Sequence, residues 1–321
     1  MDLFSRTDPF PANQSIQKGW FYMIPHYDIS QIRIGTCLPG QVAEQWGPHM
    51  ADIGFETLSV NFHMEYYGVD IEQQGPRMKA MAEEKGVEIT TLGYYCNAIQ
   101  YEEHQHNLER AIDAAHLYGA KVVSTFAGAY EGKPVDESFK KFGEVFRELA
   151  KRAEDKGVRL AIENCPMGGT WQAPTCNIGF NPRAWEVMFN EVTSDALGLE
   201  WEPAHQMIQL IDPIAQLRKW VKKVYHVHGK DASVDRRKVE DYGVLCDTDW
   251  YAPERTPGFG DSDWRDIIYI LHVGGYTGDI CVEGYHDPIY KGDWEMTAQK
   301  HALAYLKWCR GGDFTPNPWE K

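Results

Sequence analysis

The sequence predicts an α/β fold, a single (β/α)8 TIM barrel, and three observations indicate it. Eight short apolar runs alternate with stretches of helical periodicity, which is typical of a parallel sheet wrapped by helices. Several helical stretches end in glycine just before the next run. The eight units fill about 280 residues, a usual size for a closed barrel. An open doubly wound sheet is the alternative, but no GxGxxG motif follows the first run.

The elements follow one another in a regular order. Amphipathic stretches such as 106–120, 137–157 and 212–223 are the expected helices. Glycines that end helices are expected at Gly86, Gly119, Gly157 and Gly275. The eight expected strands are 32–37, 57–63, 88–96, 121–128, 159–164, 196–202, 223–228 and 279–284.

The barrel is expected to span residues 32–310. Residues 1–31 form an N-terminal arm whose aromatic part, 19–29, is predicted to pack on the domain or on a partner subunit. Residues 232–262, rich in Asp, Pro and Gly, form a long inserted loop after strand 7, and loops of this length are often functional. Residues 311–321 are a C-terminal tail.

Composition limits the possible partners. The 321 residues carry a net charge of −15 without a Lys/Arg cluster, so nucleic acid is not expected as a partner. The seven cysteines form no CxxC pair, which indicates reduced thiols and a cytoplasmic protein. The N-terminus lacks the apolar core of a signal peptide, and no run reaches the roughly 18 apolar residues that a membrane helix needs.

Polar residues gather where the predicted strands end. In a barrel of this kind the carboxyl ends of the strands meet at one mouth, which holds the active site. Three carboxylates and at least one imidazole are therefore expected to converge there. The residues at the strand ends are Asn61, Glu163, Glu202, His226, His228 and Glu283, and His205 follows Glu202 in the stretch EPAH.

Three like charges in a partly dry cleft repel one another, and a divalent cation removes the problem. Oxygen ligands with one imidazole suit Mn²⁺, Mg²⁺ or Co²⁺, and less decisively Zn²⁺. His226 and His228 share a parity on the strand, so both can point inward at different heights. His228, nearer the strand end, is the expected ligand.

Other residues are predicted to contact substrate, each with a structural alternative. A histidine or asparagine here can satisfy backbone groups, a charge in the inserted loop can be solvated, and Lys230 and Asp231 can pair with each other. A large aromatic side chain could hold a bulky substituent of the substrate. The expected substrate contacts are His205, His226, Arg255, Asn61 and Trp171.

Five motifs resemble the xylose isomerase-like TIM barrel superfamily, the sugar phosphate isomerase/epimerase group. They are AIENCP (161–166), EPAH (202–205), YHVHGKD (225–231), PGFGDSDW (257–264) and VEGYHD (282–287). The group includes ketose 3-epimerases and inosose isomerases and dehydratases, and more distantly endonuclease IV. The resemblance covers residues 32 to 310 and is specific for the superfamily, not for one member.

The resemblance implies four metal ligands, Glu163, Glu202, His228 and Glu283. It also implies that Glu163 and Glu283 face opposite sides of a bound sugar as acid and base, and that His205 holds a substrate hydroxyl. The group usually has Asp where this chain has Glu202. The extra methylene moves the carboxylate by about 1.5 Å, the length of one C–C bond. Glu202 can therefore bind the metal in a shifted geometry or leave its place to water.

The expected function is a divalent-metal-dependent isomerase or epimerase of a keto-sugar or polyol-derived ketone. Mn²⁺ is the expected ion, and the protein is expected to be a homo-oligomer. The alternative is a metal-dependent lyase or dehydratase that eliminates a β-substituent from a keto-sugar or 3-keto-glycoside. A non-catalytic sugar-binding or assembly subunit is the second alternative. A nuclease like endonuclease IV is opposed by the −15 charge and by too few histidine ligands.

Overall fold

The computed structural model describes residues 28–313, 315, 316 and 318. The N-terminal arm predicted for residues 1–31 lies almost wholly outside the described residues, so its packing stays a prediction. Within the described residues, no helix is both long enough and apolar enough to cross a membrane. All seven cysteines are free thiols.

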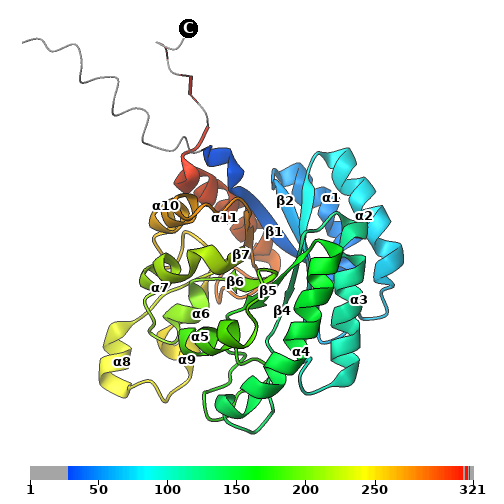
Figure 1. Cartoon of the computed structure of the whole chain (residues 1–321). Helices are drawn as coiled ribbons and strands as arrows, with labels where there is room; N and C mark the ends of the chain where they lie inside the picture. Colours follow the sequence, from blue (N-terminus) through cyan, green and yellow to red (C-terminus); the bar gives the residue numbers. More distant parts are fainter. Residues whose placement is uncertain (1–27, 314, 317, 319–321) are drawn as a thin grey trace, which may run out of the picture.

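Eight parallel strands close into a barrel, as the sequence predicts. The strand order around the barrel is β1-β10-β7-β6-β5-β4-β3-β2, and every neighbouring pair is parallel. Figure 1 shows the helices arranged around this barrel. The strands are β1 (Arg33–Pro39), β2 (Thr57–His63), β3 (Glu88–Tyr95), β4 (Val122–Thr125), β5 (Arg159–Glu163), β6 (Leu197–Trp201), β7 (Val224–Gly229) and β10 (Asp279–Val282).

The helices bury an apolar face against the barrel and carry polar residues on the outside. The glycines predicted to end helices are all in the left-handed region, where the missing Cβ avoids strain: Gly86, Gly119, Gly157 and Gly275. The larger helices are α1 (Ala43–Ile53), α2 (Ile71–Lys85), α3 (Glu102–Tyr118), α4 (Val135–Lys156), α5 (Pro182–Glu191), α7 (Pro213–Trp220), α10 (Trp264–Gly274) and α11 (Glu295–Arg310).

Several short helices lie between the larger elements along the chain. The helix α6 (Ala204–Met207) directly follows β6 and carries His205. The described residues also contain four 3₁₀ helices: η1 (Ile29–Gln31), η2 (Gly40–Val42), η3 (Val221–Lys223) and η4 (Gly292–Trp294).

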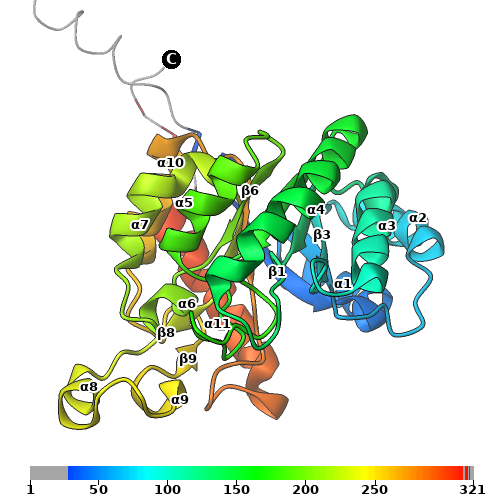
Figure 2. The same ribbon diagram turned by 60° about the horizontal axis from the view of Figure 1, so that its bottom comes forward.

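The inserted loop after strand 7 has its own secondary structure. The strands β8 (Asp231–Ala232) and β9 (Glu254–Arg255) pair antiparallel at its base. The helices α8 (Arg236–Tyr242) and α9 (Thr248–Tyr251) lie between them. Figure 2 shows α8 and α9 on the opposite side of the molecule from α1, α2 and α3. Thr248 and Asp249 of α9 line the pocket at the mouth of the barrel, so the insertion shapes that pocket.

Candidate active site and metal centre

The four predicted metal ligands meet at the mouth of the barrel. Glu163 is the last residue of β5, Glu202 follows β6, His228 lies near the end of β7, and Glu283 follows β10. One ligand atom from each side chain lies within 4.8 Å of the other three. Four consecutive barrel strands thus supply three carboxylates and one imidazole to the same point.

Nδ1 of His228 is central to this group. It lies 3.4 Å from Oε1 of Glu163, 3.8 Å from Oε2 of Glu202 and 3.2 Å from Oε2 of Glu283. Three of these side chains are almost fully buried, and Glu283 is 20% exposed. His228 Nδ1, both carboxylate oxygens of Glu202 and Oε2 of Glu283 are buried and take part in no hydrogen bond of good geometry. Ion-pair contacts from Lys230 and His205 nevertheless reach Oε2 of Glu283 and Oε1 of Glu202. Buried polar atoms rarely lack hydrogen bonds, so Nδ1 of His228 and Oε2 of Glu202 in particular point to a group that they would bind.

The charges in this group perturb one another strongly. Burial raises the pKa of Glu163 to about 7, partly offset by His228 and increased by repulsion from Glu283. Burial also raises the pKa of Glu202 well above its usual range. Burial would raise the pKa of Glu283 too, but the ammonium group of Lys230 outweighs it and holds the pKa well below the usual value. The cluster therefore cannot carry three negative charges without further positive charge.

This donor set fits a divalent cation. Three carboxylates with one imidazole suit Mn²⁺, Mg²⁺ or Co²⁺, and a Zn²⁺ site with such ligands is also known chemistry. A cation would bind the buried oxygen and nitrogen atoms of this group and would offset the repulsion between the carboxylates. Glu202, in spite of its extra methylene, lies within the same group.

Two buried asparagines fix the backbone that carries the ligands. Asn164 donates from Nδ2 to the carbonyl of Glu202 at 3.0 Å, and its Oδ1 accepts from the Glu202 N–H at 2.8 Å. Asn177 donates to the carbonyls of Glu163 and Cys165 at 2.9 and 2.8 Å. The first bridge joins the end of β5 to the end of β6, so it holds two of the ligands in register.

Lys230 is a fifth charged residue of the site. Its Nζ lies 2.8 Å from Oε2 of Glu283, 3.4 Å from Oε1 of Glu202 and 3.2 Å from Nε2 of His205. The interpretation of Lys230 and Asp231 as a pair is wrong. Asp231 instead accepts hydrogen bonds from the backbone of Ala232 and Ser262 and from the indole of Trp264, because it faces the insertion.

A pocket of about 490 Å³ opens above these ligands. His205 lies in the wall of this pocket, with its Nε2 2.5 Å from Oε1 of Glu202. Burial is the main cause that lowers the pKa of His205 to about 4, and the positive charge of Lys230 adds to it. The ring is therefore neutral. Asn61 also lines the pocket. Leu38 and Phe62 form part of an apolar wall.

Three of the predicted substrate contacts lie elsewhere. Trp171 is not a lining residue: its indole N–H donates to Asp136 and Arg183 stacks 4.1 Å from its ring centre. Arg255 forms an ion pair with Asp287 at 3.0 Å and ties β9 to the loop after β10. His226 lies below the ligands in the barrel interior and is fully buried.

Sequence reasoning missed several residues of the site. Glu200 is fully buried in β6 and contacts both His226 and His228. The signal was its spacing of two residues from Glu202, because alternate residues of an extended chain point to the same face. Tyr95 at the end of β3 and Glu254 in the insertion also line the pocket. Nothing in the local sequence of Glu254 marks it, since the fold of the insertion brings it there.

Comparisons with known proteins show the family of the chain. The xylose isomerase-like TIM barrel family model matches residues 49–309. The inosose dehydratase of Clostridium beijerinckii is 23% identical over 303 residues, which cover 85% of this chain and 97% of that relative. The solved structure of 3-keto-D-glucoside 4-epimerase YcjR from E. coli has a TM-score of 0.64 and 17% identity, covering 87% of this chain and all of that one.

A second solved structure is a xylose isomerase-like TIM barrel protein from Mycobacterium smegmatis in complex with magnesium. Its TM-score is 0.65 at 16% identity, and the match covers 89% of this chain and 98% of that one. At these identities the two solved structures show the common fold.

The fold and the ligand cluster define a (β/α)8 barrel with its site at the carboxyl ends of the strands. The chain belongs to the xylose isomerase-like TIM barrel family, as its motifs predicted. The curated relative is named an inosose dehydratase, so the prediction of an enzyme of the isomerase, epimerase or lyase type is confirmed at that level.

Proposed function

We propose that the protein is a divalent-metal-dependent isomerase or epimerase of a keto-sugar or polyol-derived ketone. The observation that carries this proposal is the convergence of Glu163, Glu202, His228 and Glu283, each with a ligand atom within 4.8 Å of the others. All of them except Glu202 line the pocket. Mn²⁺ is the expected ion, and the magnesium complex of a structural neighbour supports a hard divalent cation.

When bound, the cation would polarise a substrate carbonyl and stabilise the negative charge that develops on its oxygen. Glu163 and Glu283 supply the acid and base. They extend from β5 and β10, which are separated in the barrel by β6 and β7, so the two carboxylates reach the substrate from different sides. One removes the proton from the carbon next to the carbonyl, and the other returns a proton on the opposite face, which inverts that carbon.

The other pocket residues would orient the substrate. The neutral His205 and the amide of Asn61 can hydrogen-bond sugar hydroxyls at the pocket wall. Among the described lining residues, Lys230 is the one Lys or Arg, and it already faces Glu283 and Glu202. A phosphate would need more donors than this, so the lining supports an unphosphorylated substrate.

The second candidate is a metal-dependent lyase or dehydratase on a related keto-sugar or 3-keto-glycoside. The likeness to an inosose dehydratase over 85% of the chain favours it. Removal of the proton next to the carbonyl begins both reactions. If the resulting electron pair expels a β-hydroxyl or a β-glycosyloxy group, the product is an unsaturated ketone instead of an epimer.

The first experiment measures bound metal in the purified protein by elemental analysis, for the wild type, Glu163→Gln and His228→Ala. About one divalent ion per wild-type chain is expected, with loss in both variants. The metal-loaded enzyme is then incubated in D₂O with inososes, ketohexoses and 3-keto-glucosides and followed by NMR. An epimerase would incorporate deuterium at the carbon next to the carbonyl and invert the configuration of that carbon. A lyase would instead give the alkene signal of an unsaturated ketone. A wild type that binds no metal after soaking with Mn²⁺ contradicts the proposal.

A further inference from the structure

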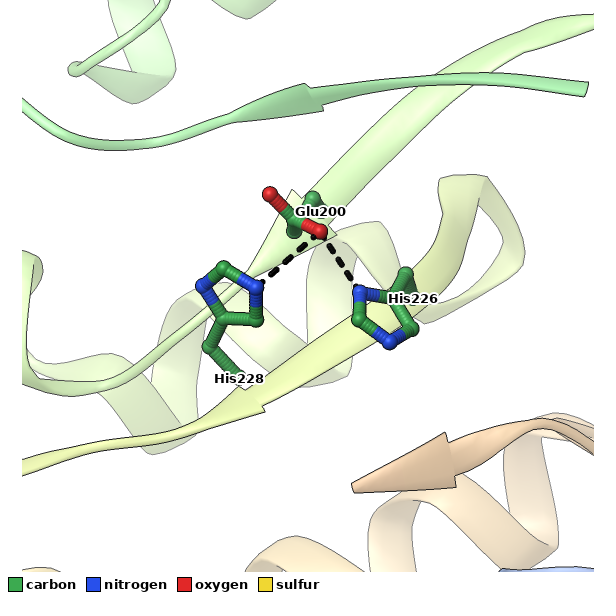
Figure 3. A group of neighbouring side chains, drawn as sticks. All are labelled: Glu200, His226 and His228. Carbon is green, nitrogen blue, oxygen red and sulfur yellow. Dashed lines mark hydrogen bonds and ion pairs between the residues drawn. The ribbon is translucent and has the colours of Figure 1, made fainter. Parts of the chain in front are cut away.

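A buried line of alternating imidazoles and carboxylates continues from the ligand cluster into the barrel. Nε2 of His228 lies 3.2 Å from Oε1 of Glu200, and Nδ1 of His226 lies 2.6 Å from the same oxygen. Figure 3 shows both rings directed at this carboxylate. On the far side, Nε2 of His226 lies 3.4 Å from Oδ1 of Asp279. Exposed fractions of these side chains are 2% or less.

Glu200 is held by donors on both of its oxygens. The hydroxyl of Tyr95 donates to Oε2 at 2.8 Å, and the hydroxyl of Ser124 donates to Oε1. Nδ1 of His226 also bonds to Oε1, and since an ionised carboxylate can only accept, this nitrogen carries the proton. Groups from β3, β4 and β7 therefore fix the position of one carboxylate on β6.

The same reasoning assigns the proton on His228. Its Nε2 faces Glu200 and the hydroxyl of Tyr95, whose own proton is directed to Glu200. Nε2 must then be the N–H of the ring. This leaves the lone pair of a neutral His228 on Nδ1, the atom that faces Glu163, Glu202 and Glu283. A ring in the other tautomer would direct an N–H at the site of the cation.

We propose that Glu200 is a positioning residue that fixes the tautomer and orientation of His228, so that Nδ1 is presented to the metal. This inference rests on the proposed metal site but assigns Glu200 a role distinct from the four ligands. Carboxylates that hold a ligating histidine in this way affect metal affinity by about 10- to 100-fold. Tyr95, Ser124 and His226 act one step further away, because they hold Glu200.

The tautomer is measured directly by NMR of protein labelled with ¹⁵N-histidine, in the metal-free state. Burial alone would lower the pKa of His228, but Glu200 outweighs it and raises the pKa well above the usual value, so the pH is raised until the ring is neutral. His228→Asn identifies the signal of His228 by its loss. The wild type is expected to show protonated Nε2 and unprotonated Nδ1 on this ring. An Nδ1–H tautomer in the wild type overturns the proposal. This measurement needs no metal and no substrate, so it stays informative even if the proposed catalytic function is wrong.

Glu200→Gln preserves the shape of the side chain, but its amide can donate to Nε2 of His228 and so favour the wrong tautomer. The variant is expected to shift the ring towards Nδ1–H and to lower Mn²⁺ affinity, measured by chelator competition, about 10- to 100-fold. Glu186→Gln, the same change on the exposed face of α5, is the control and should match the wild type. Unchanged tautomer and affinity in a folded Glu200→Gln overturn the proposal.

If the Glu200 variant does not fold, Tyr95→Phe provides the test instead. It removes one hydrogen-bond donor to Glu200 and leaves the carboxylate in place. It is expected to weaken Mn²⁺ binding by a smaller factor and to raise the Nδ1–H population. Stoichiometry gives a further check. Two Mn²⁺ ions per chain would mean that Glu200 and His226 bind a metal themselves, which contradicts a positioning role.

Discussion

The ammonium group of Lys230 lies 2.8 Å from Oε2 of Glu283. Both side chains belong to the pocket, and the lysine is 3% exposed. The ammonium neutralises one of the three ligand carboxylates, which leaves two negative charges, the amount that one divalent cation balances. Glu254 is a further carboxylate near this lysine. Its Oε1 lies 3.7 Å from Nζ of Lys230, and its Oε2 lies 3.3 Å from Nδ1 of His286. The lysine and the cation would therefore share the task of keeping Glu283 ionised.

Lys230→Met tests this division of roles. The variant should still bind Mn²⁺, with equal or higher affinity, because a positive charge near the cation is removed. Turnover should fall by about 100-fold or more, since Glu283 and His205 lose the group that orients them. Titration with Mn²⁺ and a turnover assay give the two values, with Lys222→Met at the opposite end of the barrel as control. Loss of metal with full turnover would contradict the assignment.

Metal removal should lower the stability of the whole domain. A ligand that binds the native state at 100 times its Kd stabilises it by about 2.7 kcal/mol. For a domain of this size that corresponds to roughly 5 °C in Tm. Calorimetry after chelation and after return of Mn²⁺ measures the shift. His228→Ala should show no Mn²⁺-dependent rise in Tm, and an equal rise in that variant would place the bound ion elsewhere.

The order of strands and the place of the ligands could be predicted from the sequence for a physical reason. Barrel strands are covered on both faces, so they form short apolar runs, and parallel topology brings their carboxyl ends to one mouth. Glu163 and Glu283 stand at such ends and lie in the cluster. Their roles as acid and base stay predictions.

Other parts of the site depend on side-chain directions that a sequence does not contain. The backbone of Lys230 could have directed its ammonium towards Asp231 or towards the mouth, and only the fold of the insertion decides. Trp171 and Arg255 stand in suitable loops, yet they pack against Arg183 and Asp287. Glu200 is hidden inside an apolar run, where its partners come from three other strands.

Asn164→Ala should damage both stability and metal binding. The substitution leaves the buried N–H and carbonyl of Glu202 without partners. A loss of about 1–3 kcal/mol in the free energy of unfolding is expected. Glu202 loses its fixed position, so Mn²⁺ should bind more weakly. Urea unfolding of the metal-free protein and a Mn²⁺ titration separate the two effects. Wild-type affinity in the variant would show that the bridge between β5 and β6 does not position Glu202.

Glu56→Gln should lower stability in a manner that depends on pH. Its carboxylate accepts from Arg310 at 2.7 and 2.9 Å and from the N–H of Ile34 at 2.8 Å, which joins β1 to α11. Burial alone would raise the pKa of Glu56, but the hydrogen bonds from Arg310 and Ile34 outweigh it and lower the pKa.

A lowered pKa in the folded state means that the contribution of Glu56 is complete above the ordinary glutamate pKa, about 4.3, and is lost as the pH falls through the folded value. Glu56→Gln should therefore cost about 1–2 kcal/mol in the free energy of unfolding at pH 7 and pH 5. The difference from wild type should shrink at pH 3.5 and below. Urea unfolding at the three pH values measures it. A difference that grows on acidification would mean that Glu56 is destabilised by its burial and that Arg310 does not compensate for it.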